Sequence, residues 1–264
     1  MKKFRRGICC AVAIVLVAVL CAGTHGMEKE QKVSAYTEKG SEKGNIVKQG
    51  AKKTRASYKI AIDAGHQQHA NLATEPVGPK AAVKKAKVAG GATGTASKVP
   101  EYKLTLRVAK KLSKILKAKG YQVYMVRTSN NVNISNKQRA VRANRSGADI
   151  YLRIHADASA SSGVRGASML YPSTRNRYVS RLSKSSKRLS DCILKKYCKK
   201  TGIKSRGLIE RDDLTGTNWS KIPVTLIEMG FLTNRSEDYF MQKPANQSKM
   251  ASGIAEGIDD YFGF

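Results

Sequence analysis

Three residues that can bind a metal or work beside one each close a short apolar run of this chain. They are His66 after residues 58–65, His155 after residues 149–154, and Glu228 after residues 223–227. Histidine is the commonest metal ligand, through a neutral imidazole nitrogen. Two histidines with one carboxylate are an established ligand set for catalytic zinc, which keeps a fourth position for water. If these side chains meet in the fold, the pattern indicates a metal-dependent hydrolase.

The carboxylate of such a site has two leading candidates, Glu101 and Glu228, because the chain has only 19 acidic residues against 49 lysines and arginines. Glu101 opens a predicted helix, where the helix dipole also favours a negative charge. Glu228 ends an apolar run, where an ionisable group is costly to bury without a partner. A glutamate beside a metal and its water is well placed as a general base. The residues alone leave open which glutamate is the ligand.

The apolar runs must position these residues. Runs of this length, rich in Ile, Val and Leu, predict buried strands. Helix-like segments lie between them, which predicts parallel strands joined by helical crossovers. In such sheets, ligands bind outside the carboxyl ends of the strands. We therefore expect an α/β fold: a single domain with a mostly parallel central sheet flanked by helices, and the candidate residues at one edge.

The other elements follow from periodicity and from capping signals. Further strands are predicted over residues 121–126 and 167–171. Four helices are predicted. The first runs from Glu101 to about Gly120, the second follows a capping box at residues 135–138, and the other two cover residues 178–200 and 244–261. Residues 67–100 are expected to be an irregular loop, which could be a basic flap over the site.

The first residues predict export. Residues 1–23 combine a basic start with an apolar stretch, which is typical of a signal peptide or of an uncleaved anchor. Residues 24–57 are polar and rich in Lys, Glu, Gly and Ser, and predict a flexible linker before a catalytic domain over 58–264. We expect an exported protein at the cell wall or at the outer face of the cytoplasmic membrane, touching the membrane only through this first segment.

The cysteines bear on disulfide bonding, and the net charge bears on the kind of partner that the protein binds. Cys192 and Cys198 are the only cysteines outside residues 1–23, and six residues apart on one helix they are not expected to pair. The net charge is +30, and residues 1–23 contribute four of the positive charges and no acidic residue, which leaves +26. Such an excess indicates an anionic partner. An exported protein rarely meets nucleic acid, so we expect anionic wall polymers; a solvated basic surface is the alternative.

The chain resembles the zinc-dependent N-acetylmuramoyl-L-alanine amidases of the Amidase_3 family over about residues 58–262. The matching segments are IAIDAGH (60–66), QRAVRAN (138–144), LRIHA (152–156) and VTLIEMGFLTN (224–234), with Glu101 and the pairs at 165–166 and 206–207. The resemblance implies a peptidoglycan hydrolase that uses zinc. It also implies that His66, Glu101 and His155 are the zinc ligands and that Glu228 is the catalytic carboxylate.

The positions where this sequence differs from the family pattern bear on the shape of the substrate groove and not on the predicted metal ligands. Ala64 stands where the family usually has proline, residues 67–69 replace a glycine-rich stretch, and the gap between His66 and Glu101 is longer than is common. Two other functions remain open: a non-catalytic basic wall-binding protein, and a zinc peptidase that cleaves within the stem peptide.

Secondary roles are expected for a few other residues. Asp63 either orients a ligand imidazole or accepts hydrogen bonds from local backbone amides. Arg139 and Asn144 are expected to hold the fold together. Trp219 either lines the substrate groove or packs in the fold, and His69 could compete as a ligand because it lies three residues after His66.

Overall fold

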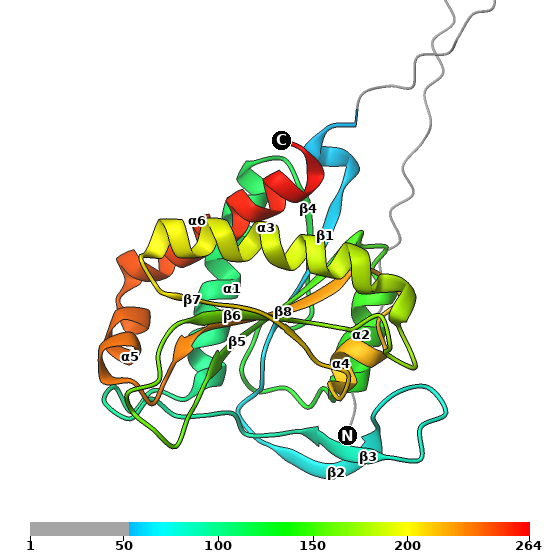
Figure 1. Ribbon diagram of the computed structural model, residues 1–264, viewed down its shortest axis with the longest axis horizontal. Helices are drawn as coiled ribbons and strands as arrows, with labels where there is room; N and C mark the ends of the chain where they lie inside the picture. Colours follow the sequence, from blue (N-terminus) through cyan, green and yellow to red (C-terminus); the bar gives the residue numbers. More distant parts are fainter. Residues whose placement is uncertain (1–52) are drawn as a thin grey trace, which may run out of the picture. The chain divides into compact units, whose positions relative to one another are not determined.

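The computed structural model describes residues 53–264 (Figure 1). The predicted signal peptide or anchor (1–23) and the predicted linker up to residue 52 lie outside the described residues. The short helix η1 (Arg55–Ser57) packs on the domain, because Arg55 pairs with Asp259 at 2.8 Å. The last residues of the expected linker thus contact the domain. Among residues 53–264, no helix is both long and apolar enough to cross a membrane.

A six-stranded sheet forms the centre of the domain, in the order β4-β1-β5-β8-β6-β7. Its strands are β1 (Lys59–Ala64), β4 (Gln122–Met125), β5 (Ile150–Asp157), β6 (Ala167–Tyr171), β7 (Ser205–Glu210) and β8 (Val224–Phe231). All neighbouring pairs are parallel except β6 and β8. The prediction of an α/β fold with a mostly parallel sheet is confirmed.

The strands at the centre are buried on both faces because helices cover them, and most of their residues are apolar. Ile60 and Ile62 of β1 belong to the core under α1 (Glu101–Ala118), α3 (Ser183–Thr201) and α6 (Pro244–Phe262). Ala61 belongs to the core under α2 (Asn136–Arg145). Figure 1 shows α3 and α6 lying side by side across one face of the sheet.

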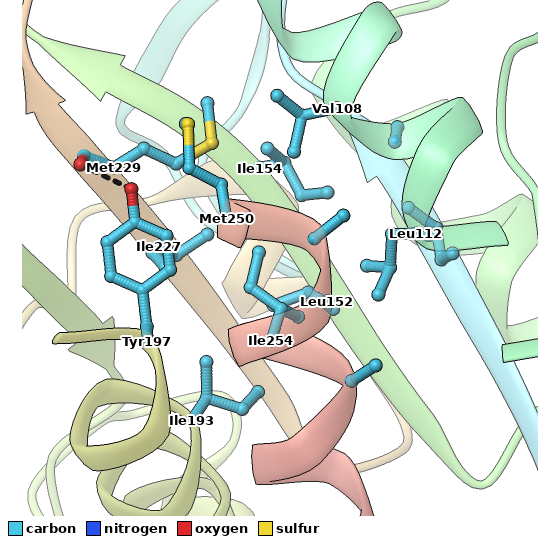
Figure 2. Close-up of a cluster of buried hydrophobic side chains, with 14 of the residues drawn as sticks. Val108, Leu112, Leu152, Ile154, Ile193, Tyr197, Ile227, Met229, Met250 and Ile254 are labelled. Carbon is cyan, nitrogen blue, oxygen red and sulfur yellow. Dashed lines mark hydrogen bonds between the residues drawn. The ribbon is translucent and has the colours of Figure 1, made fainter. Parts of the chain in front are cut away.

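The larger core lies between the sheet and helices α1, α3 and α6 (Figure 2). Gly257 allows α3 and α6 to approach closely, because a Cβ atom there would lie 2.4 Å from the Cα atom of Ile193. Tyr197 buries its ring in the same core and donates its hydroxyl to the carbonyl oxygen of Met229, at 2.7 Å. This bond ties α3 to β8, the strand that carries Glu228.

Several local predictions are confirmed. Ser135 and Gln138 form the capping box that starts α2. Gly202 ends α3 in a left-handed conformation, as expected for a C-cap glycine. Cys192 and Cys198 are both free thiols.

The expectation of an irregular loop over residues 67–100 is wrong. The segment contains an antiparallel hairpin of β2 (Asn71–Pro76) and β3 (Lys84–Val88). The hairpin is held by contacts from distant parts of the chain: Lys85 pairs with Asp213 at 2.7 Å, and Glu75 accepts a hydrogen bond from the backbone of Lys137. Strand β7 and the short helices α4 (Thr215–Asn218) and α5 (Arg235–Gln242) were also not predicted.

Candidate metal centre

His66, Glu101 and His155 meet at the carboxyl ends of β1 and β5 and the start of α1. Each residue offers one ligand atom, and these three atoms all lie within 4.8 Å of one another. Glu101 stands between the two imidazoles: its Oε2 is 3.2 Å from Nε2 of His66, and its Oε1 is 3.1 Å from Nδ1 of His155. In the part of the chain that the structure describes, this is the one group of three or more such side chains that could hold a metal ion.

His66 is oriented by the loop that follows the hairpin. Its Nδ1 lies 2.8 Å from the carbonyl oxygen of Ala89. A carbonyl oxygen can only accept, so Nδ1 carries the proton and Nε2, which faces Glu101, is left free to bind a metal. The backbone of His66 is left-handed, with φ of +58°. Such a conformation is uncommon for a residue other than glycine and needs support from its surroundings.

Glu101 is the first residue of α1 and is buried. Its carboxylate accepts hydrogen bonds from the backbone amides of Ala92 and Ala156, each at 3.0 Å. Burial by itself raises the pKa of this carboxyl, but the contacts with His155 and His66 outweigh burial and hold the pKa well below its usual range. Glu101 is therefore ionised and fixed in place, as a metal ligand must be.

His155 is almost fully buried on β5, and its Nε2 has no hydrogen-bond partner among residues 53–264. Burial lowers the pKa of His155 to about 4, and its contact with Glu101 only partly opposes this. The imidazole is therefore neutral at neutral pH, which is the form that binds metals. Two imidazoles and one ionised carboxylate, with an unpaired buried nitrogen on His155, fit a catalytic zinc site.

The ring of His155 lies directly on Gly65, so this glycine can be used to test the site. A Cβ atom at Gly65 would lie 2.3 Å from Cε1 and 2.5 Å from Nε2 of His155. Gly65→Ala should displace the ring, and misplacement of a catalytic group by about 1 Å costs roughly 100-fold in rate. The metal content and any activity that depends on the metal should both fall. Gly90→Ala is the matched control, because nothing lies within 4 Å of a Cβ atom there; equal losses in both variants would contradict the assignment.

Glu228 lies beside this group without belonging to it. In the sheet its Cα atom is paired with that of His155 on β5 and with that of Ser168 on β6. Its Oε2 is buried and has no hydrogen-bond partner among residues 53–264. Burial, and then the charges of Glu101 and Asp157, raise the pKa of Glu228 well above its usual value. A carboxylate with a raised pKa binds a proton more readily than an ordinary glutamate, as a general base must.

Two buried arginines hold the loop that carries His66. Arg139 donates to the carbonyl oxygens of Ala64 and His66, at 2.9 and 2.8 Å. Arg127 donates to those of Ala64 and Gly65, at 2.8 and 3.0 Å. Three successive carbonyl groups are thus fixed by guanidinium groups, which supports the strained backbone at His66. The expected structural role of Arg139 is confirmed, whereas Arg127 was not predicted.

Both expectations for Asp63 are wrong. Its carboxylate contacts neither imidazole and accepts no local backbone hydrogen bond. It accepts instead from Arg139 at 2.7 Å, Tyr151 at 2.9 Å and Arg153 at 3.2 Å. Asp63 therefore acts on the site indirectly, by holding the arginine that fixes the His66 loop.

Asp63 should make the fold sensitive to acid. Burial alone would raise its pKa, but Arg139 and Arg153 lower the pKa from 3.8 to about 2. Because the folded-state pKa is the lower one, the ionised carboxylate stabilises the fold above about pH 4, and that stability is lost as the pH falls toward 2. Asp63→Asn should cost about 3–5 kcal/mol at neutral pH, because it leaves buried arginines unpaired, and should flatten the fall in stability between pH 4 and 2.

Urea unfolding at several pH values measures this effect. Asp191→Asn is a matched control, because Asp191 pairs with Lys195 on the exposed surface of α3. Such surface pairs contribute about 0–1 kcal/mol. A similar small loss in Asp63→Asn would contradict the role given to Asp63.

The remaining predicted residues lie away from the metal group. His69 is exposed and does not join the group. Trp219 packs in the fold: its Nε1 donates to the carbonyl oxygen of Pro76, at 3.0 Å, and Lys137 lies over its ring. Asn144 bonds to the backbone of Trp219 and of Lys221, which confirms its structural role.

Two hollows meet at the metal group and share His66, His155 and Glu228 in their walls. The first has a volume of about 270 Å³ and lies between β3 of the hairpin and the loop after β7. The second has a volume of about 250 Å³ and runs along residues 91–92 and 156–158. A linear substrate could therefore cross the candidate metal centre with one part in each hollow.

Known proteins resemble this chain in both sequence and structure. The Amidase_3 family, described as N-acetylmuramoyl-L-alanine amidase, matches residues 60–260. The N-acetylmuramoyl-L-alanine amidase LytC of Bacillus subtilis is 30% identical over 162 residues, which cover 61% of this chain and 31% of LytC. The chain thus spans about a third of the length of that curated relative.

Solved structures share the fold over most of the chain. An N-acetylmuramoyl-L-alanine amidase from Clostridium difficile 630 matches with a TM-score of 0.63 and 29% identity, over 78% of this chain and 97% of that structure. An N-acetylmuramyl-L-alanine amidase from Mycobacterium smegmatis matches with a TM-score of 0.73 and 23% identity, over 80% of this chain and 99% of that one. At that lower identity the second match speaks for the fold alone.

Proposed function

Because the chain belongs to the Amidase_3 family of N-acetylmuramoyl-L-alanine amidases, we propose that it hydrolyses the amide bond between N-acetylmuramic acid and L-alanine in peptidoglycan. The observation that carries this proposal is the convergence of His66, Glu101 and His155 on one point beside Glu228. The LytC and Clostridium difficile proteins that it resembles carry the same activity in their names. A peptidase that cleaves within the stem peptide is the alternative for the same set of side chains.

The metal that we propose for this site is zinc, held by His66, Glu101 and His155. A zinc ion supplies Lewis-acid chemistry: it polarises a carbonyl group and lowers the pKa of a water molecule toward about 7. The protein's own part is to keep the imidazole of His155 neutral and Glu101 ionised. Ala89 fixes the tautomer of His66 through its carbonyl oxygen.

Glu228 is the general base in this proposal. Its buried and unpaired Oε2 takes the proton of the attacking water and passes it to the nitrogen of the departing L-alanine. Its raised pKa favours the second step, because the protonated carboxyl must persist until the amine leaves. Glu228 suits this role better than that of a ligand, since it lies outside the group of three ligand atoms.

The excess of positive charge supports a role at the cell wall. The net charge of +30 suits a surface that carries phosphate polymers and peptide carboxylates. We propose that the protein is exported and held at the wall by this charge, so that its binding to walls weakens steeply with added salt. Walls stripped of their phosphate polymers should bind less protein at low salt, and equal binding would contradict this part of the proposal.

A digest of purified peptidoglycan, analysed by mass spectrometry, tests the reaction itself. The proposal predicts free stem peptides whose amino terminus is L-alanine, together with glycan strands that have lost their peptides. Cleavage inside the stem would identify a peptidase. Binding to the wall without any product would identify a non-catalytic wall-binding protein.

A further inference from the structure

The two hollows beside the metal group differ in charge. The first, which we call the basic arm, has Lys85, Arg153 and Arg211 in its wall, and Asp213 is the counter-ion of Lys85 and Arg211. The second, the acidic arm, adds Glu101, Asp157 and small residues to the three residues that both hollows share, and no lysine or arginine of the described chain belongs to its wall. The two ends of a bound substrate therefore meet opposite electrostatic environments.

Arg153 is the buried cation of the basic arm. It lies on β5 two residues before His155, so both side chains are on the same face of the sheet. Its Nε donates to Asp63 at 3.2 Å and its Nη2 donates to Asn136 at 2.7 Å. Its Nη1 has no hydrogen-bond partner among residues 53–264. Arg153 is 3% exposed and still forms part of the wall of the hollow, so it holds a free donor toward the arm.

The position of Arg153 is fixed by Gly216 of α4. A Cβ atom at Gly216 would lie 2.6 Å from Cζ and 2.7 Å from Nη1 of Arg153. The guanidinium group therefore packs directly on the backbone of Gly216, in space that any larger side chain at this position would occupy. Together with Asp63 and Asn136, this contact orients the group before any ligand arrives, and a preoriented donor costs little entropy on binding.

Arg211 and Lys85 carry the positive charge at the mouth of the arm. Arg211 donates through Nε and Nη2 to Asp213, at 2.7 and 3.1 Å, and Lys85 donates to the same carboxylate at 2.7 Å. One aspartate thus joins the hairpin to the loop after β7. Because two cations share one carboxylate, the mouth keeps an excess of positive charge.

We propose that the basic arm binds a carboxylate of the stem peptide, and that the acidic arm receives the muramoyl sugar. This proposal rests on the proposed amidase function and adds a direction and a specificity to it. In the stem, L-alanine is followed by a glutamyl residue linked through its γ-carboxyl group, which leaves its α-carboxylate free unless it is amidated. This carboxylate lies one residue from the scissile bond, and guanidinium groups bind carboxylates through strong, charge-assisted hydrogen bonds.

Two synthetic substrates test the proposal. Both are N-acetylmuramoyl peptides of the same sequence, and the second residue of the stem carries either a free α-carboxylate or a carboxamide. We expect the wild-type, zinc-loaded enzyme to prefer the free acid by about tenfold or more in kcat/KM, as for a hydrogen bond to a charged group. Arg153→Gln, Arg211→Gln and Gly216→Ala should each reduce this preference toward unity.

The ratio of the two kcat/KM values is independent of the fraction of active enzyme, so it remains informative in a variant that folds poorly. Arg107→Gln is the matched control, because Arg107 is exposed on α1 outside both arms and should keep the wild-type ratio. If the wild type cleaves both substrates equally well, the carboxylate site is overturned and the amidase function stands. If it cleaves neither substrate, both proposals are overturned.

Discussion

Glu228→Gln should reduce the rate of peptidoglycan hydrolysis by about 100- to 10,000-fold, the range that general-base catalysis usually contributes. Glutamine keeps the size of the side chain but cannot accept the proton of the attacking water. The fold should be unaffected, since Oε2 of Glu228 makes no hydrogen bond within the described residues. Because burial raises the pKa of Glu228, replacement of this carboxyl by a neutral amide of the same size should not destabilise the protein.

Zinc content distinguishes loss of the base from loss of the metal. Glu228→Gln should bind one zinc ion per chain as the wild type does, because Glu228 is not one of the three ligands in this account. Glu256→Gln is the matched control: Glu256 pairs with Lys200 on the surface formed by α3 and α6, and its variant should keep full activity. A Glu228→Gln enzyme near the wild-type rate, or one that has lost its zinc, would refute the role given to Glu228.

His155→Ala should remove both zinc and activity. Loss even of a residue that only supports a ligand weakens metal binding by about 10- to 100-fold, so loss of a ligand itself should weaken it by more. The ring of His155 is also held in place, between Gly65 and Glu101. Zinc affinity measured by competition with a chelator should therefore show the largest decrease of any single change proposed for this protein.

His69→Ala is the control for this experiment. It removes the same kind of side chain three residues after His66, but from an exposed position outside the metal group. Its zinc affinity should match that of the wild type. If His69→Ala and His155→Ala lost zinc to the same extent, the ligand set would have to be redrawn.

The sheet and its strand-end residues could be predicted because one pattern determines both. Strands β1, β5 and β8 are mostly apolar and buried on both faces, which is typical of a parallel sheet between helices, and parallel strands bring their carboxyl ends to one edge. His66, His155 and Glu228 therefore had to come together there. Glu101 lies on a helix, and nothing in the sequence pattern places the start of that helix at this edge. Its assignment as a ligand therefore follows only from the family resemblance.

The surroundings of the site could not be predicted, because long-range contacts form them. Hairpin β2–β3 is polar and largely exposed, and no alternation of apolar residues marks its strands. The partners of Asp63 lie 76, 88 and 90 residues away along the chain. Arg153 is a charged residue within an otherwise apolar run, where a buried charge is unusual. This was the only feature of the sequence that could have indicated the basic arm.

The most direct measurement is a crystal structure of the zinc-loaded protein, with anomalous scattering recorded on both sides of the zinc absorption edge. The account predicts a single strong anomalous peak bonded to His66, Glu101 and His155 at about 2.0–2.2 Å. Glu228 should lie near this peak without binding it, and at least one position on the ion should face the two arms. A peak bound by other residues, or an ion whose ligands include Glu228 in place of Glu101, would contradict the account.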